Sequence, residues 1–258
     1  MLVGGIPLFL GGGAVSYVGW AIFGYGYTSA NVSITNTVSN IGVVATDTAG
    51  VGTARSALAA AGFGGDKAIF GYGYTSTNVS ITNLVSNIGV VATDTTAVGT
   101  ARRLFAAAGF GGDRAIFGYG FTNIPTSLTN LVSNTGVVAT DTAGVGTARY
   151  GPAAAGFGGD KAIFGYGGDS NGIRVSITNK VSNGGVVATD TTGVGTARDR
   201  LAATGFGGDK AIFGYGYSSN AASVVSITNT VDNTGVVATD TTGVGTARVD
   251  TAAASFGG

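Results

Sequence analysis

Aspartate and arginine recur together at a fixed spacing along this chain. In each of five similar segments, an aspartate is followed eight residues later by an arginine. The pairs are Asp47 and Arg55, Asp94 and Arg102, Asp141 and Arg149, Asp190 and Arg198, and Asp240 and Arg248. Such pairs suit either a ring of carboxylates that binds a cation or does acid–base work, or charge-assisted hydrogen bonds that fix connections between strands. Because catalysis seldom needs five equivalent pairs and an unpaired buried charge is costly, we favour structural ion pairs.

The rest of the composition leaves few other reactive groups. The 258 residues include no cysteine and no histidine, and all 13 acidic residues are aspartates. We therefore expect no metal site, no cofactor and no disulfide. Thirteen basic residues balance the acids, and a net charge of zero disfavours a nucleic-acid partner. Residues 1–13 are apolar but contain glycines and Pro7, so we interpret them as a tether or strand rather than a membrane span.

The charged pairs belong to a long internal repeat. The sequence Ala-Ile-Phe-Gly-Tyr-Gly begins at residues 21, 68, 115, 162 and 211, at intervals of 47, 47, 47 and 49 residues. A repeat of this length indicates one supersecondary unit copied in tandem, with each copy burying its apolar surface against the next. We assign residues 14–258 to a single domain built from five repeats of about 47 residues.

Four strands separated by turn signals fit each repeat. In the second copy and its flanks they cover residues 58–64, 67–72, 79–85 and 90–95, with a tight two-residue turn at Gly65-Asp66. Four short antiparallel strands repeated five times predict an all-β fold, a five-bladed β-propeller. The first strand, made of alanine and glycine, would lie nearest the axis. A β-solenoid is the alternative, but tight turns that alternate with longer loops favour hairpins.

The glycines that flank the repeated tyrosine predict a contact between blades. Gly71 and Gly73 surround Tyr72 in the second strand. A glycine inside a strand often marks a close approach by another group. We expect an aromatic ring of a neighbouring blade to pack on this backbone.

Both ends of the chain bear on how a ring would close. Residues 252–258 repeat the first-strand sequence, but no second strand follows them. Their natural partner is the second strand of the first blade, residues 20–25, and this pairing would clasp the ring. Residues 14–18 could occupy the same place, which would leave the C-terminal strand free to add to another subunit. We favour internal closure, with self-association through the terminal strands as the alternative.

Two segments differ between copies while the rest is nearly constant. One is the loop between the second and third strands, and the other follows the repeated arginine. In a four-stranded meander both emerge on the same face, so this face is a candidate binding surface, although loops also vary when little constrains them. Aromatic residues at the loop starts could stack on sugars or pack between blades. The candidate ligand-binding residues are Tyr27, Tyr74, Phe121 and Tyr217 in the loops, and Arg103, Tyr150 and Asp199 in the second segment.

Two resemblances suggest a context for the repeat. The segment Phe-Gly-Gly-Asp-Lys-Ala-Ile-Phe-Gly-Tyr-Gly at residues 63–73 resembles a kelch-type propeller blade, without the tryptophan that kelch blades carry late in the repeat. The segments DKAIFGYG at 66–73 and TNLVSNTGVVATDTAGVGTAR at 129–149 resemble repeats in structural proteins of marine bacteriophages, especially cyanophages. The second resemblance implies a virion or fibre protein, located in the virion or outside the cell.

We therefore expect a non-enzymatic binding or structural module that recognises a surface glycan or another virion protein through the variable face. The alternatives are a spacer or a strand-exchanged filament subunit. A glycan-processing enzyme would need a pair of carboxylates set apart from the repeat. The only acids outside the repeated positions, Asp169, Asp199, Asp232 and Asp250, fall in different blades. We therefore expect no enzymatic activity.

Overall fold

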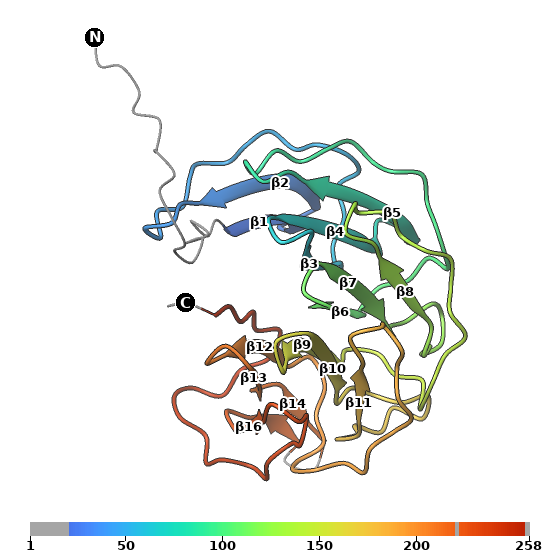
Figure 1. Ribbon diagram of the computed structural model, residues 1–258, viewed down its shortest axis with the longest axis vertical. Helices are drawn as coiled ribbons and strands as arrows, with labels where there is room; N and C mark the ends of the chain where they lie inside the picture. Colours follow the sequence, from blue (N-terminus) through green and yellow to red (C-terminus); the bar gives the residue numbers. More distant parts are fainter. Residues whose placement is uncertain (1–20, 220–221, 256–258) are drawn as a thin grey trace, which may run out of the picture.

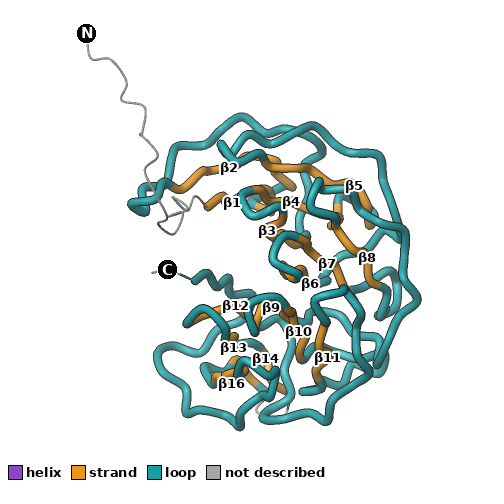
Figure 2. Tube along the Cα trace, in the orientation of Figure 1, coloured by secondary structure: helices purple, strands orange, loops and turns teal. Residues whose placement is uncertain are grey.

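A computed structural model describes residues 21–219 and 222–255, and these residues form β-strands and no helix (Figures 1 and 2). The predicted all-β fold is thus confirmed for this part of the chain. The apolar segment 1–13 and the candidate strand 14–18 lie outside the described residues.

Four antiparallel sheets of three strands follow one another along the chain, after a first sheet of two strands. The first sheet pairs β1 (Ala21–Tyr27) with β2 (Asn31–Val38). The others are β3 (Ala59–Phe63), β4 (Lys67–Tyr74) and β5 (Asn78–Val85); β6 (Ala106–Phe110), β7 (Arg114–Gly118) and β8 (Thr129–Val132); β9 (Ala153–Phe157), β10 (Lys161–Gly165) and β11 (Thr178–Val181); and β12 (Ala202–Phe206), β13 (Lys210–Gly214) and β16 (Thr228–Val231). A small hairpin pairs β14 (Tyr217–Ser218) with β15 (Ser223–Val224).

The turn between the first two strands of a sheet is longer than predicted. Phe63 pairs with Lys67, so the loop is Gly64-Gly65-Asp66 rather than Gly65-Asp66 alone. Gly64 and Gly65 have φ angles of 62° and 80°, in the left-handed region that glycine occupies without a steric penalty. The pair of glycines in each repeat is therefore explained by the hairpin itself.

The predicted fourth strand, residues 90–95, does not form a continuous strand. It meets β5 only at two isolated bridges, Val85 with Val91 and Thr82 with Thr95. Between these bridges the side chain of Asn83 donates a hydrogen bond to the carbonyl oxygen of Ala92 (3.0 Å). Because a side chain occupies this carbonyl, the regular backbone ladder is interrupted there. The prediction of four-stranded blades was wrong in this respect, and each complete sheet has three strands.

The sheets are arranged along an arc that stays open between its two ends (Figures 1 and 2). The first strands β3, β6, β9 and β12 lie side by side along the inside of the arc, and β5, β8 and β11 lie toward the outside (Figure 1). The expected closed ring is not formed by the described residues. Residues 251–255 are in no strand, and β1 pairs only with β2.

The boundary between neighbouring sheets is the main apolar core of the protein. The ring of Phe117 packs on the backbone of Gly71 in the preceding sheet, where a Cβ would lie 2.6 Å from its Cζ. Phe117 also contacts the Tyr72 ring, with 5.4 Å between centroids, and both side chains are fully buried. The predicted packing of a neighbouring ring on this glycine is confirmed. A bulge between Gly71 and Gly73, with a φ of 53° at Tyr72, turns the tyrosine toward that neighbour.

Candidate functional site

Four of the five repeated arginines, Arg55, Arg102, Arg149 and Arg198, lie at the boundaries between sheets and are fully buried. The guanidinium of Arg55 donates from Nε to the carbonyl oxygen of Tyr72 (2.7 Å) and from Nη2 to Oδ1 of Asn83 (2.6 Å). It also lies over the ring of Tyr25 in the first sheet, 4.2 Å from the centroid. One guanidinium therefore joins two sheets through a cation–π contact and charge-assisted hydrogen bonds.

Each buried arginine pairs with the aspartate of the following repeat. Nη1 of Arg55 is 4.0 Å from Oδ1 of Asp94, and Asn83 donates to the same carboxylate oxygen (2.9 Å). The corresponding pairs are Arg102 with Asp141, Arg149 with Asp190, and Arg198 with Asp240. The eight-residue spacing predicted partners within one repeat, such as Asp47 with Arg55, and this assignment is corrected by the structure. A pair within one repeat and a pair between successive repeats recur at the same interval along the chain, so the sequence does not distinguish them.

The aspartate of each network is held by the sheet before it. Thr53 donates to Asp94 from its backbone nitrogen (3.0 Å) and from Oγ1 (2.6 Å). Burial acts to raise the pKa of Asp94, but the hydrogen bonds from Thr53 and Asn83 outweigh it and hold the pKa below its ordinary value. Sequence reasoning missed Thr53 and Asn83. The sequence signal for Asn83 was an asparagine that recurs at the same position of the third strand in every repeat.

These networks are suited to structure rather than to chemistry. Each carboxylate is occupied by a threonine, an asparagine and an arginine, and successive networks lie at different boundaries. Within residues 21–219 and 222–255, no three acidic, histidine or cysteine side chains gather as metal ligands would. The ring of carboxylates considered for cation binding therefore has no counterpart in this part of the chain.

The two variable segments of each repeat are brought together, as the meander predicted. Backbone bridges join Ser56 with Tyr74, Arg103 with Phe121, Tyr150 with Gly168, and Asp199 with Tyr217. In each pair the first residue follows a repeated arginine, and the second begins a loop between the second and third strands. We call the surface made by these segments, residues 27–31, 56–58, 74–78, 103–105, 121–126, 150–152, 168–174, 199–201 and 217–219, the loop face.

Four of the candidate ligand-binding residues form one cluster on the loop face. The guanidinium of Arg103 lies 4.4 Å from the ring centroid of Tyr74 and 5.3 Å from that of Phe121. Phe121 contacts Tyr150 edge to face, with centroids 6.0 Å apart. The side chain of Arg103 makes one long hydrogen bond, from Nη1 to Oδ1 of Asn78 (3.4 Å), and among the described residues no carboxylate pairs with it.

A second cluster contains Asp199 and Tyr217. Asp199 is 1% exposed and lies 3.3 Å from Nε of Arg174 and 3.7 Å from Nε of Arg200. Burial raises the pKa of the Asp199 carboxyl, and the two arginines oppose that shift. Arg174 also lies over the ring of Tyr217 at 5.0 Å. A ligand would therefore meet the arginines and Tyr217 before it met Asp199.

The remaining aromatic candidate stands apart. Tyr27 begins the loop of the first sheet and is 69% exposed. The rings of Tyr74, Phe121 and Tyr217 are half-buried and each carries a guanidinium. The four loop aromatics are therefore not equivalent platforms, although the repeat places them at equivalent positions.

The acids outside the repeated positions have separate roles. Asp169 and Asp232 accept hydrogen bonds from the backbone of their own turns, at Ile173 (2.9 Å) and Val236 (2.9 Å). Asp250 lies 3.5 Å from Nη1 of Arg200, which also contacts Asp199. The guanidinium of Arg200 thus neutralises both Asp199 and Asp250. This arrangement does not leave either carboxylate free as a nucleophile or a base.

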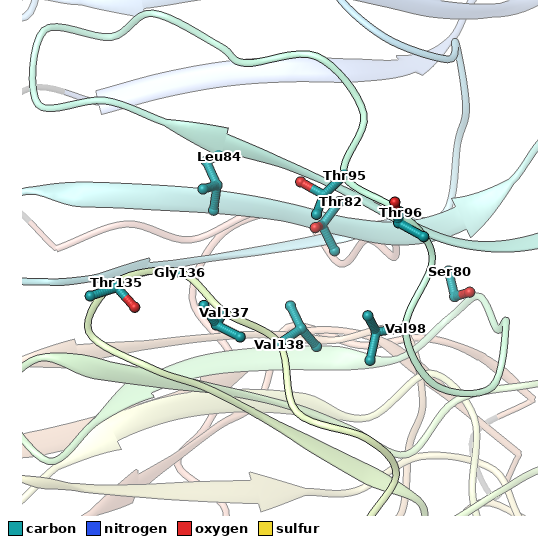
Figure 3. Close-up of a pocket in the computed structure, with 10 residues that line it drawn as sticks. All are labelled: Ser80, Thr82, Leu84, Thr95, Thr96, Val98, Thr135, Gly136, Val137 and Val138. Carbon is teal, nitrogen blue, oxygen red and sulfur yellow. The ribbon is translucent and has the colours of Figure 1, made fainter.

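A cavity of about 180 Å³ lies between the second and third repeats (Figure 3). Figure 3 shows Thr82, Leu84 and Thr95 on one side of it, and Val137 and Val138 on the other. Its lining contains hydroxyl and aliphatic groups and no charged side chain. Its hydroxyl groups have no charged residue beside them in this lining that could act as the base that activates a nucleophile.

No protein-family model matches the chain, and no curated protein matches it. None of the described residues lies in a helix that is long and apolar enough to cross a membrane.

Proposed function

We propose that this chain is a non-enzymatic binding module with a five-bladed, β-propeller-like architecture, and that its loop face recognises a surface glycan with acidic sugars. The repeated sheets supply a constant scaffold, and the residues that differ between repeats gather on one face of it. Side chains for binding are commonly carried on loops held by a rigid scaffold.

The stacked arginine on the loop face is the observation that carries this proposal. Arg103 is held between Tyr74 and Phe121 without an ion-pair partner among the described residues. A guanidinium in this setting binds a carboxylate through paired hydrogen bonds. The neighbouring aromatic rings provide flat apolar surface for a sugar ring. Together these groups suit a sugar that bears a carboxylate.

The interactions of the aspartates argue against catalysis. Asp94, Asp141, Asp190 and Asp240 are occupied at the sheet boundaries, and the aspartates of the hairpin turns pair with the lysine or arginine that follows them. The acids outside the repeat hold turns or neutralise arginines. A glycan-processing enzyme needs one carboxyl as acid and another as base or nucleophile across the scissile bond.

The resemblance of the repeats to those of marine phage structural proteins supports a virion or extracellular location. A virion protein is the alternative partner for the loop face, because tyrosine and arginine are also frequent at the centres of protein interfaces. A spacer without any ligand is the remaining structural alternative.

The test is binding of the multivalently displayed protein to an array of acidic and neutral glycans. We expect binding to acidic glycans, weakened about ten- to hundredfold by Arg103→Gln, because a hydrogen bond to a charged group contributes about 1.5–3 kcal/mol. Tyr27→Ala tests whether the exposed aromatic adds to binding. Asp113→Asn, in the turn between β6 and β7, is the matched control and should bind like the wild type. No signal on any glycan, or equal binding by Arg103→Gln, would contradict the proposal.

A further inference from the structure

The four boundaries between sheets use the same set of contacts. A phenylalanine of the following sheet packs on a glycine and a tyrosine of the preceding one, as Phe117 does on Gly71 and Tyr72. The arginine and threonine that follow the preceding sheet in the chain donate hydrogen bonds to the asparagine and the aspartate of the following repeat, respectively. That asparagine also donates a hydrogen bond to that aspartate. At three of the four boundaries a second phenylalanine, such as Phe63, also lies against the glycine of a turn in the following repeat, Gly136.

The first sheet carries the groups that face a preceding sheet at the other boundaries, and no described residue packs against them as a preceding sheet does. Phe23 is 59% exposed, whereas its counterparts Phe70, Phe117, Phe164 and Phe213 are at most 4% exposed. Asn36 donates to Asp47 (2.8 Å), as the buried asparagines do in their sheets, but Asp47 is exposed and has no arginine partner among the described residues. A Cβ at Gly42 would meet no atom within 4 Å.

The last sheet carries the groups that face a following sheet at the internal boundaries, and these groups have the same geometry there. Arg248 lies 4.0 Å over the ring of Tyr215 and donates to the carbonyl oxygen of Thr246 (3.0 Å), as the buried arginines do. Arg248 is nevertheless exposed. A pocket of about 120 Å³ lies beside Gly214, Tyr215 and Arg248. At internal boundaries the phenylalanine ring of the next sheet occupies this position.

Two further features match across the ends. Phe206 is 39% exposed, whereas Phe63, Phe110 and Phe157 are 3% exposed, and its expected neighbour is the uncovered Gly42. Among residues 21–219 and 222–255, no inner strand pairs with β1 in the way that β3 pairs with β4. Residues 252–255 repeat that strand, are exposed, and line the pocket at the last sheet through Ala252 and Ala253.

We infer that the two ends bind each other between two copies of this chain, in a head-to-tail contact that reproduces the internal boundary. Phe23 would enter the pocket at Gly214 and Tyr215, Asp47 would pair with Arg248 through Asn36, and residues 252–255 would pair with β1 of the next copy. The partner is a second copy because the arc holds its own ends apart (Figure 1). No hydrogen bond among the described residues joins the first sheet to the last repeat. Such a heterologous contact produces a closed ring of chains or an open filament.

The test is the mass of particles in solution, measured by analytical ultracentrifugation from micromolar to millimolar concentration. We expect the wild type to form multiples of its 25.1 kDa chain in a concentration-dependent manner. Asp47→Arg disrupts the contact surface of the first sheet by placing an arginine opposite Arg248. Gly214→Leu disrupts the contact surface of the last sheet by filling the pocket that would receive Phe23. A Cβ at Gly214 meets only Thr228 Cγ2, at 3.3 Å, so this variant should fold. Each variant alone should be a monomer.

An equimolar mixture of these two variants distinguishes head-to-tail binding from other association. Each variant keeps one intact end, so the mixture should form dimers and nothing larger. Asp113→Arg carries the same charge change in the middle of the arc and should assemble like the wild type. A wild type that is monomeric at every concentration, including one closed on itself, would overturn the inference. Assembly of either single variant to the wild-type extent would also overturn it.

Discussion

Arg55 and Asp94 belong to successive repeats and face each other across the boundary between two sheets, 4.0 Å apart, with Asn83 hydrogen-bonded to both. The arginine is fully buried, and its hydrogen bonds to Tyr72 and Asn83 and its pairing with Asp94 form only while the next sheet is in place. A single repeat therefore cannot satisfy its own charged groups. This contact gives the array strong coupling between neighbours, as expected for a repeat protein stabilised by nearest-neighbour interfaces.

The asparagine that bridges arginine and aspartate should contribute strongly to the free energy of unfolding. Asn130 is fully buried and accepts a hydrogen bond from Nη2 of Arg102 (2.6 Å). Asn130→Ala leaves this buried guanidinium without its partner, and we expect a loss of about 2–4 kcal/mol in the free energy of unfolding. Asn36→Ala, at the same repeat position but without an arginine partner, should cost less than about 1 kcal/mol. Urea denaturation of both variants measures the difference, and equal losses would argue against the bridging role.

Glycine is required where a neighbouring ring packs, and the last sheet provides the comparison. A Cβ at Gly165 would lie 2.7 Å from Cζ of Phe213, whereas one at Gly214 would meet only Thr228. We expect Gly165→Ala to cost about 1–3 kcal/mol through overpacking, which lowers the melting temperature by several degrees. Gly214→Ala, studied at a concentration low enough to keep the chain monomeric, should change the melting temperature little. Calorimetry of both variants measures the two melting temperatures. A Gly165→Ala variant with the melting temperature of the wild type would contradict the prediction.

Acid should destabilise the protein in a defined pH range. Burial acts to raise the pKa of Asp94, Asp141, Asp190 and Asp240, but hydrogen bonds from threonine and asparagine hold each pKa below its ordinary value of 3.8. A lowered folded-state pKa stabilises the protein above the unfolded value, and this stability is lost as pH falls through the folded-state pKa. We therefore expect stability to decline below about pH 4, as followed by circular dichroism. Asp141→Asn should weaken this dependence, and a wild type equally stable at neutral and strongly acidic pH would count against it.

Alkaline conditions should act through the buried tyrosines. Burial raises the pKa of Tyr72, Tyr119 and Tyr166 to about 12, against the opposing influence of the neighbouring arginines. Since each folded-state pKa lies above the unfolded value of 10.0, the associated stability is present below pH 10 and is lost as pH rises toward 12. An ultraviolet titration of tyrosinate should show a late component that coincides with unfolding. Its amplitude should fall in Tyr119→Phe.

Local features were predictable because local chemistry determines them. The apolar run 67–72 and the run 79–85 became β4 and β5, and the paired glycines formed the hairpin between β3 and β4. The packing of Phe117 on Gly71 was also predictable, because a glycine inside a strand commonly marks the place where another group approaches the backbone. The strand predicted at residues 90–95 failed because propensity does not reveal that the Asn83 side chain occupies the Ala92 carbonyl.

The sequence by itself determined that the protein is an array of β-hairpin units with five equivalent charged positions, because periodicity and turn chemistry are readable one repeat at a time. Only the tertiary structure decided which copy supplies each partner and that the described arc leaves both ends uncovered. In a periodic chain, a contact within one repeat and a contact with the next repeat have the same period. Side-chain packing at the boundary distinguishes the two kinds of contact, because it brings Arg55 to the aspartate of the next repeat, Asp94.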